Sequence, residues 1–320
     1  GNGSTTAEPW PWAPCDERLC SVLPLRALAP VTAVCVALFV LGVAGNTLTV
    51  LVVARGPPRA PASLYLGSMA VSDLLILLGL PLDLYRLWRS RPWPFGPLLC
   101  RLSHFVAEGS AYCSVLHVTA LTGERYLAVR FPLRAKALAT TRRVKAVIGA
   151  LWALAFLSAA PFLFLVGVER AENGTDASSE CKPTPQALRS GLLAAMFWVT
   201  TGYFVLPVAC LHVLYGCVGR QLRRGTVPLR GPDAAHRTRA HRQALRVLLA
   251  VVLAFVLCWL PFHMGRIVFI STQDTRTMLF SQYFNLLALQ LFYLSASINP
   301  ILYNAISRQF REAAWRLLLP

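Results

Sequence analysis

Long apolar segments alternate with short polar and basic ones along almost the whole chain. Seven of the apolar segments are long enough to form membrane-spanning helices, because about 20 helical residues cross the roughly 30 Å hydrocarbon core of a bilayer. They cover approximately residues 30–54, 62–88, 100–126, 144–165, 189–218, 242–270 and 280–303. The pattern therefore predicts an all-α membrane protein, a seven-transmembrane helix bundle.

The third apolar segment, from Cys100 to Tyr126, is the one around which the others are organised. At about 1.5 Å per residue its ends lie roughly 39 Å apart, which is more than the thickness of the hydrocarbon core. It carries a lone carboxylate at Glu108 and closes with Glu124-Arg125-Tyr126. A carboxylate inside a membrane is costly unless it is paired, so Glu108 marks a candidate functional site.

The chain outside the spans forms two terminal segments. Residues 1–28 are rich in proline and polar groups and predict an extracellular glycosylated tail, whereas residues 29–306 hold the seven-transmembrane domain. The apolar side chains of residues 307–320 form one helical stripe: Phe310, Ala313, Ala314 and Leu317. This stripe is typical of a short amphipathic cytoplasmic helix at the inner membrane surface.

Composition and charge set the class of protein and its orientation. Hydrophobic residues make up 56% of the chain and charged ones only 14%, which excludes a soluble globular fold. The formal net charge is +17, but the basic residues lie in short clusters between apolar segments, which argues against nucleic-acid binding. Basic loops mark the cytoplasmic face, so the amino end is expected outside the plasma membrane, with glycosylation sequons at Asn2 and Asn173.

The nine cysteines divide into two groups. Five lie inside apolar segments: Cys35, Cys113, Cys210, Cys217 and Cys258. The other four lie near predicted outer segments, where an oxidising compartment favours disulfides: Cys15, Cys20, Cys100 and Cys181. Four cysteines allow three pairings, which spacing alone does not separate.

Catalysis has no support in the sequence. There is no cluster of His, Cys or carboxylate residues with metal-binding spacing, no glycine-rich phosphate loop and no nucleophile elbow. The polar residues inside the spans number one or two per helix, without the broken helices of secondary transporters. We therefore expect a protein that is not an enzyme, and a membrane transporter remains the alternative from a different class.

The polar residues inside the spans carry a family resemblance. Each span contributes a characteristic residue or motif in chain order: Asn46, Asp73, Glu124-Arg125-Tyr126, Trp152, Pro207, Cys258-Trp259-Leu260-Pro261 and Asn299-Pro300-Ile301-Leu302-Tyr303. Each motif alone is weak, but the ordered set covers nearly the whole chain and resembles the rhodopsin-like G-protein-coupled receptors. The runs CWLPFHMGRI and LFYLSASINPILYN are similar to the ghrelin and motilin receptor branch, most of all to its motilin receptors.

The resemblance implies a disulfide and a conformational switch. It implies that Cys100 pairs with Cys181, and the turn-prone stretch between Cys15 and Cys20 favours a second pair. The residues implied for the switch between an outer pocket and an inner cleft are Glu124, Arg125, Tyr126, Pro207, Val115, Phe255, Trp259, Pro261, Tyr215, Asn299, Pro300 and Tyr303. No cofactor is expected apart from an allosteric sodium ion, for which the candidate residues are Asp73, Ser114, Ser295 and Asn299.

The resemblance also implies the ligand and the partner. The ligand would be a gastrointestinal peptide hormone, motilin first and a ghrelin-type or other peptide of the branch as the alternative, and the partner a heterotrimeric G protein of the Gq class. An opsin is excluded because the seventh span contains no lysine, and an amine ligand is disfavoured because Ala107 stands where amine receptors have aspartate.

The candidate ligand-binding residues follow from the same resemblance: Glu108, Arg266, Asp83, Arg86, Phe262, Phe292, Tyr112 and Trp93. Glu108 and Arg266 are expected to face each other across the cavity, with the ammonium group of the peptide meeting Glu108. The alternative is that this pair only ties the third span to the sixth. Tyr112 and Val115 are expected to continue the face of Glu108 toward Phe255 and Trp259.

Overall fold

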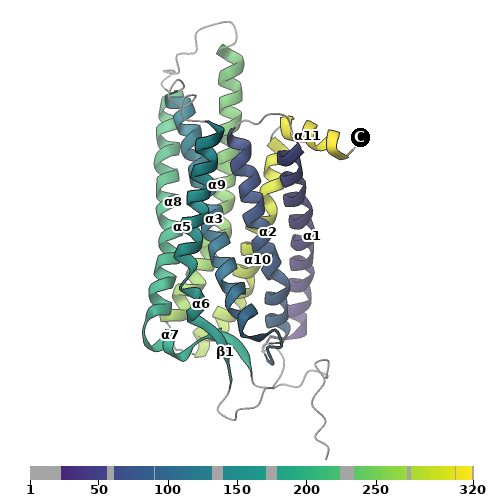
Figure 1. Ribbon diagram of the computed structural model, residues 1–320, viewed down its shortest axis with the longest axis vertical. Coiled ribbons are helices and arrows are strands. Elements are labelled where there is room, and N and C mark those ends of the chain that lie inside the picture. Colours follow the sequence, from purple (N-terminus) through teal and green to yellow (C-terminus); the bar gives the residue numbers. More distant parts are fainter. Residues whose placement is uncertain are drawn as a thin grey trace, which may run out of the picture.

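The structure is a computed structural model that describes residues 23–55, 61–89, 91–131, 140–170, 179–223, 234–271, 275–306 and 308–318. The helices are α1 (Leu25–Arg55), α2 (Pro61–Trp88), α3 (Gly96–Arg130), α5 (Thr141–Ala159), α6 (Phe162–Leu165), α7 (Pro185–Arg189), α8 (Leu192–Arg223), α9 (Ala234–Ser271), α10 (Thr275–Ile306) and α11 (Arg308–Leu318). Two short strands, β1 (Val166–Glu169) and β2 (Glu180–Pro183), form an antiparallel hairpin. The long helices run side by side along one axis, and the prediction of an all-α bundle is confirmed (Figure 1).

Apolar length alone identifies six spans among the described residues: α1, α2, α5 together with α6, α8, α9 and α10. The seventh, α3, is long enough at 35 residues but is less hydrophobic than the other six. It contacts α2, α5 and α8, so protein rather than lipid covers much of its surface. A central helix needs less apolar surface, because its polar groups find partners inside the bundle.

Several helices extend beyond the predicted spans. α1 begins at Leu25, so the last residues assigned to the tail are helical, and α9 begins at Ala234 instead of near Arg242. In Figure 1, α9 rises beyond the neighbouring helices at the end where α11 lies. Hydropathy marks only the part of a helix inside the hydrocarbon core, whereas backbone hydrogen bonding continues into water through residues that favour helices.

The end of the bundle opposite α11 is covered by the hairpin, which the sequence pattern did not predict. The fourth span is interrupted near Pro161: α5 stops at Ala159 and the short α6 follows. In the hairpin Val168 pairs with Cys181, and the Trp93 amide donates to the Ser179 carbonyl at 2.9 Å. Cys181 is joined to Cys100 of α3 by a disulfide, so that predicted pairing is confirmed.

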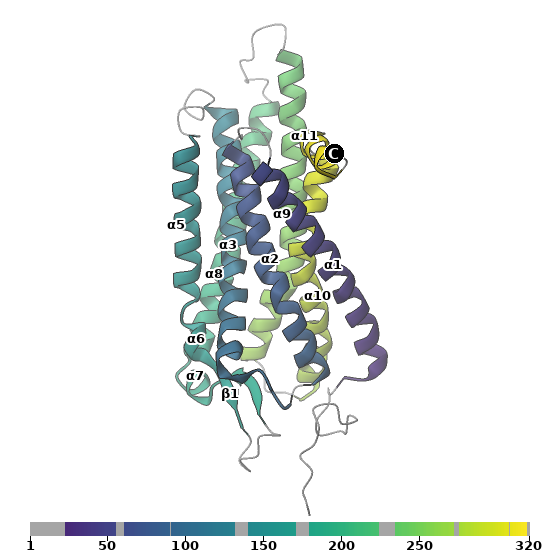
Figure 2. The same ribbon diagram turned by 45° about the vertical axis from the view of Figure 1, so that its right-hand side comes forward.

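α11 lies across the other end of the bundle, at a steep angle to the long helices (Figures 1 and 2). It contacts α1 and α10. Ala314 is buried, whereas Arg311, Trp315 and Arg316 are exposed. The helix is therefore amphipathic, as its sequence predicted, and its place on a membrane surface stays a prediction.

The main core cluster lies in the half of the bundle that the hairpin covers. It joins buried residues of six helices around Trp259: Cys35, Ile76, Leu77, Leu80, Ala111, Val115, Phe204, Phe255, Cys258, Phe292, Tyr293 and Ala296. Pro81, Pro207, Pro261 and Pro300 stand inside their helices. Each proline removes one backbone hydrogen bond, which makes these helices the natural places to bend.

Candidate functional site

A buried ion pair joins α3 to α9. Arg266 donates through Nη2 to Oε1 of Glu108, whose side chain is only 4% exposed, against 18% for that of Arg266. The Arg266 guanidinium also lies between two rings, with its Cζ 4.9 Å from the centroid of Phe197 and 4.1 Å from that of Phe262. Two aromatic faces and one carboxylate therefore hold this cation in place, the arrangement for which a planar guanidinium is suited.

Tyr112 lies one turn below Glu108 and faces a different neighbour from the one expected. Its hydroxyl is 2.6 Å from Thr200 Oγ1 of α8, and its ring stacks on Tyr203 at 4.3 Å between centroids. Only Val115 belongs to the cluster with Phe255 and Trp259. The expectation that Tyr112 continues toward those two residues is wrong, because the two positions lie three residues apart and so point about 60° apart around the helix.

A second ion pair lies at the end of α2 that is next to the hairpin. Arg86 Nη1 donates to Asp83 Oδ1 at 2.6 Å, and the Tyr293 hydroxyl of α10 donates to Asp83 Oδ2 at 2.7 Å. Arg86 Nη2 donates to Ser103 at 2.8 Å and to Cys181 Sγ at 3.4 Å. These contacts tie α2, α3, α10 and the hairpin together at one point.

Trp93 belongs to this second group of contacts and not to the first. The Arg86 guanidinium lies 4.8 Å from the centroid of its ring, and the indole donates to the Gly96 carbonyl at 2.9 Å. The indole packs edge-on against Tyr85 and Phe95. Trp93 is only 4% exposed, so its direct role is to hold Arg86.

An aromatic layer lies below the two ion pairs. Trp259 contacts Phe292 at 5.2 Å and Phe262 at 5.8 Å between ring centroids, and Phe262 stacks on Phe292. Trp259 also stacks on Phe255, one turn earlier in α9. The predicted ligand-contacting residues therefore pack directly against residues of the predicted switch. These ring contacts lie on both sides of Pro261.

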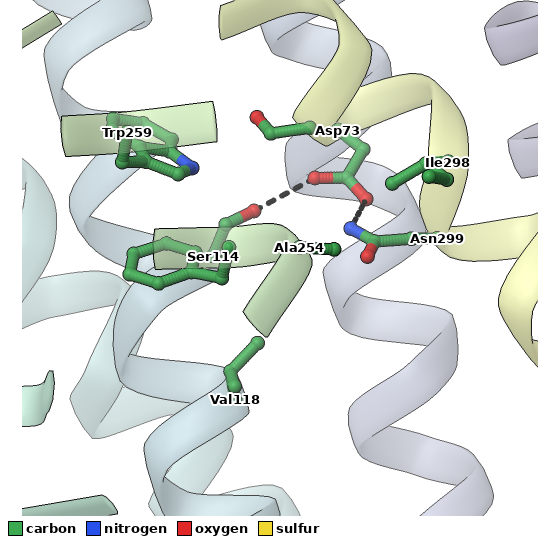
Figure 3. A pocket seen from close by; sticks show the side chains of 9 residues that line it. Asp73, Ser114, Val118, Ala254, Trp259, Ile298 and Asn299 are labelled. Atoms are coloured by element: carbon green, nitrogen blue, oxygen red, sulfur yellow. Dashed lines mark hydrogen bonds between the residues drawn. The ribbon is translucent and has the colours of Figure 1, made fainter. Parts of the chain in front are cut away.

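A small cavity lies deeper, around Asp73 (Figure 3). Its volume is about 20 Å³, and its lining includes the four residues predicted to hold sodium: Asp73, Ser114, Ser295 and Asn299. The Ser114 hydroxyl and the Asn299 amide each donate to one Asp73 oxygen at 2.8 Å. One water-sized occupant needs about 10 to 15 Å³, and carboxylate and hydroxyl oxygens are ligands for hard cations, so these residues fit a sodium ion.

The inner end of the predicted switch is described only in part. The side chains of Arg125, Tyr215 and Tyr303 lie outside the described residues, as do Cys15, Cys20, Asn2 and Asn173. Glu124 is hydrogen bonded to Tyr65 of α2. The predictions about the arginine switch, the second disulfide and glycosylation therefore stay predictions.

Sequence reasoning missed several polar contacts of the site, among them those of Thr200, Tyr293 and Ser103. A separate network joins three helices, with the Trp152 indole donating to Ser68 and Ser68 2.9 Å from His117 Nε2. A hydroxyl inside an apolar span was the available signal, because such groups seek partners within the bundle. Which partner each one meets depends on packing between spans, which spacing along the chain does not encode.

Comparison with known proteins identifies the family. Residues 45–303 match the family model described as 7 transmembrane receptor (rhodopsin family). The chain is 56% identical over 368 residues to the human Motilin receptor, covering 99% of this chain and 89% of that protein. It is 53% identical over 311 residues to human Growth hormone secretagogue receptor type 1, with 94% and 84% covered. Human Neurotensin receptor type 1 is 37% identical over 311 residues, with 88% and 74% covered. The chain therefore belongs to the rhodopsin family of seven-transmembrane receptors, and it is a multi-pass membrane receptor and not an enzyme.

Proposed function

We propose that this chain is a plasma-membrane receptor for a gastrointestinal peptide hormone, most like motilin, and that it activates a heterotrimeric G protein of the Gq class. The observation that carries the proposal is 56% identity, over nearly the whole chain, to a protein named for motilin. The 53% identity to a growth hormone secretagogue receptor keeps a ghrelin-type peptide as the alternative.

The orientation follows from charge. The basic segments between the spans face the cytoplasm, so residues 1–28 and the hairpin face outward and residues 307–320 lie at the inner membrane surface. The ion pairs Glu108–Arg266 and Asp83–Arg86 both lie in the half of the bundle covered by the hairpin. A peptide that enters from outside therefore meets them first.

The ligand pose uses the charges that this half of the bundle offers. The amino terminus of the peptide inserts first, its ammonium group meets Glu108, and its first apolar side chains pack on Phe262 and Phe292. Asp83, Arg86 and the loop of Trp93 contact the following residues. The support for this pose is that Arg266 engages only one oxygen of Glu108, whereas Asp83 already accepts from both Arg86 and Tyr293.

Calcium release in cells that express this chain tests the function. The cells are exposed to a panel of gut peptides that includes motilin and ghrelin, with untransfected cells as the control. We expect motilin to act at the lowest concentration; a lower effective concentration for ghrelin would select the alternative ligand. Uptake of a labelled solute without agonist-stimulated guanine-nucleotide exchange would instead identify a transporter.

Sodium is the one small ligand that we propose for the bundle, held by Asp73 with Ser114, Ser295 and Asn299. Binding to the folded protein alone raises stability by about 1.4 kcal/mol at ten times the dissociation constant. We expect the melting temperature of the purified receptor to rise by a few degrees in sodium chloride relative to choline chloride, and Asp73→Asn to abolish the difference. An equal rise in the variant would exclude Asp73 as the ligand.

The acid beside Arg125 is expected to restrain basal signalling. Glu124→Gln removes the negative charge that holds Arg125 in the resting state, and a coupling of about 1 kcal/mol corresponds to roughly a fivefold rise in activity without agonist. Basal inositol phosphate accumulation at matched surface expression measures this rise. Glu169→Gln, in the hairpin at the other end of the bundle, is the control, and unchanged basal output of Glu124→Gln would argue against the restraint.

A further inference from the structure

His104 of α3 is a histidine to which the function described so far gives no role. It stands four residues before Glu108, so it lies on the same face of the helix, one turn nearer the hairpin. Its Nε2 atom is buried and has no hydrogen-bond partner among the described residues. A buried polar atom without a partner is costly, which makes this nitrogen a candidate contact for a ligand.

Two arginines reach α3 close to His104. Arg86 donates to Ser103, the residue before it, and Arg266 donates to Glu108, the residue one turn after it. Ser103 and Glu108 are five residues apart, which is about 7.5 Å along a helix. The charges of both arginines act on the ring of His104. The imidazole therefore lies close to both guanidinium groups.

Each of these arginines also has one buried nitrogen left over. Arg86 Nε and Arg266 Nη1 have no hydrogen-bond partner within the part of the chain that the structure describes. Both atoms can only donate, because a guanidinium has no acceptor. The carboxylates nearby are already engaged, Asp83 Oδ1 with Arg86 and Glu108 Oε1 with Arg266. The two donors and the imidazole nitrogen therefore suit acceptor oxygens that a ligand supplies.

A peptide main chain offers acceptors of the right kind and spacing. A carbonyl oxygen is uncharged and has two lone pairs, and both guanidinium groups are already balanced by carboxylates. An extended peptide advances about 3.3 to 3.6 Å per residue, and His104 lies about 6 Å from Glu108 along α3. A chain whose ammonium group meets Glu108 therefore brings its first two carbonyl groups past His104.

We propose that His104 is a specificity-determining residue: together with Arg86 and Arg266 it binds the first two backbone carbonyl groups of the peptide. The inference rests on the proposed function, since it assumes that an extended peptide enters with its amino terminus first. It adds a contact to the main chain, which fixes the course of the peptide independently of its side chains.

His104→Leu tests the proposal, because leucine fills a similar place and forms no hydrogen bond. The ligands are motilin and two analogues in which an E-alkene replaces the first or the second peptide group, which removes the carbonyl oxygen and keeps the extended geometry. At least one analogue should bind wild-type receptor about tenfold more weakly than motilin, the worth of one hydrogen bond to a charged group. His104→Leu should reduce that loss by about fivefold, the worth of one neutral hydrogen bond.

The chain supplies a matched control. His212 of α8 is also a histidine, but it is exposed and its Nδ1 donates to the Val208 carbonyl of its own helix at 2.8 Å. His212→Leu should keep the wild-type losses for both analogues. His104→Gln returns a side-chain nitrogen near the place of Nε2 and should restore most of the wild-type loss. If His104→Leu does not reach the cell surface, His104→Ala is measured in its place.

The same losses in wild-type receptor and in His104→Leu would overturn the proposal, because the carbonyl groups and the imidazole would then act independently. A free inorganic anion is the other source of an acceptor. The melting temperature of peptide-free receptor is therefore compared in potassium chloride and potassium gluconate. Stabilisation by chloride that His104→Leu abolishes would assign the site to an anion and would also overturn the proposal. If motilin does not bind wild-type receptor, the proposed function fails; if motilin binds and both analogues match it, only this inference fails.

Discussion

Glu108→Gln is expected to weaken the binding of motilin with a free amino terminus by about 30-fold or more, because loss of one partner from a buried charge pair costs at least 2 kcal/mol. Nα-acetylated motilin carries no ammonium group and should lose far less. Glutamine keeps the shape of the side chain and can still accept from Arg266. Competition binding with both peptides on wild-type and variant receptors gives the two losses.

The hairpin provides a matched control for that measurement. Glu180 is also an acid paired with cations, Arg91 at 3.1 Å and Lys182 at 3.4 Å, but its side chain is 26% exposed. An exposed ion pair contributes about 0 to 1 kcal/mol, so Glu180→Gln should change neither peptide by more than about fivefold. Equal losses of the two peptides in Glu108→Gln would show that the Glu108–Arg266 pair supports the pocket without reading the charge of the ligand.

The membrane spans were predictable because each one must present about 20 apolar residues to lipid. The limits of that signal are visible at α3 and α9. α3 carries Glu108 and Glu124 and is less hydrophobic than the other spans, yet it is the helix that most of the bundle contacts. α9 begins at Ala234, well before the apolar run that identified it, because helical hydrogen bonding does not end where the lipid does.

The contacts between spans were predictable only in part. Glu108 and Arg266 are far apart in the sequence, and the resemblance to a family, not the spacing, suggested their pairing. Neither the resemblance nor the spacing predicted that Thr200 contacts Glu108 or that Phe197 contacts Arg266. The hairpin was missed because β1 and β2 have four residues each, too short for an alternating pattern to emerge.

The disulfide between Cys100 and Cys181 is expected to have the second large effect. It joins the first turns of α3 to the hairpin, and it adds to contacts that Arg86 and Trp93 make with the same strand and loop. Loss of a native disulfide costs about 2 to 5 kcal/mol. In this bundle the helices stay inserted without it, so the loss falls on the ordering of the hairpin over the pocket and therefore on ligand binding.

Cys100→Ala and Cys181→Ala should each reduce motilin affinity by about 30-fold or more, the lower end of that range. Because one bond is lost in both cases, the double variant should lose no more than either single variant. Cys210→Ala is the control, since Cys210 is an exposed free cysteine of α8. Additive losses in the double variant would mean that the two thiols act separately, and wild-type affinity in all three variants would mean that the contacts of Trp93 and Arg86 hold the hairpin in place without the bond.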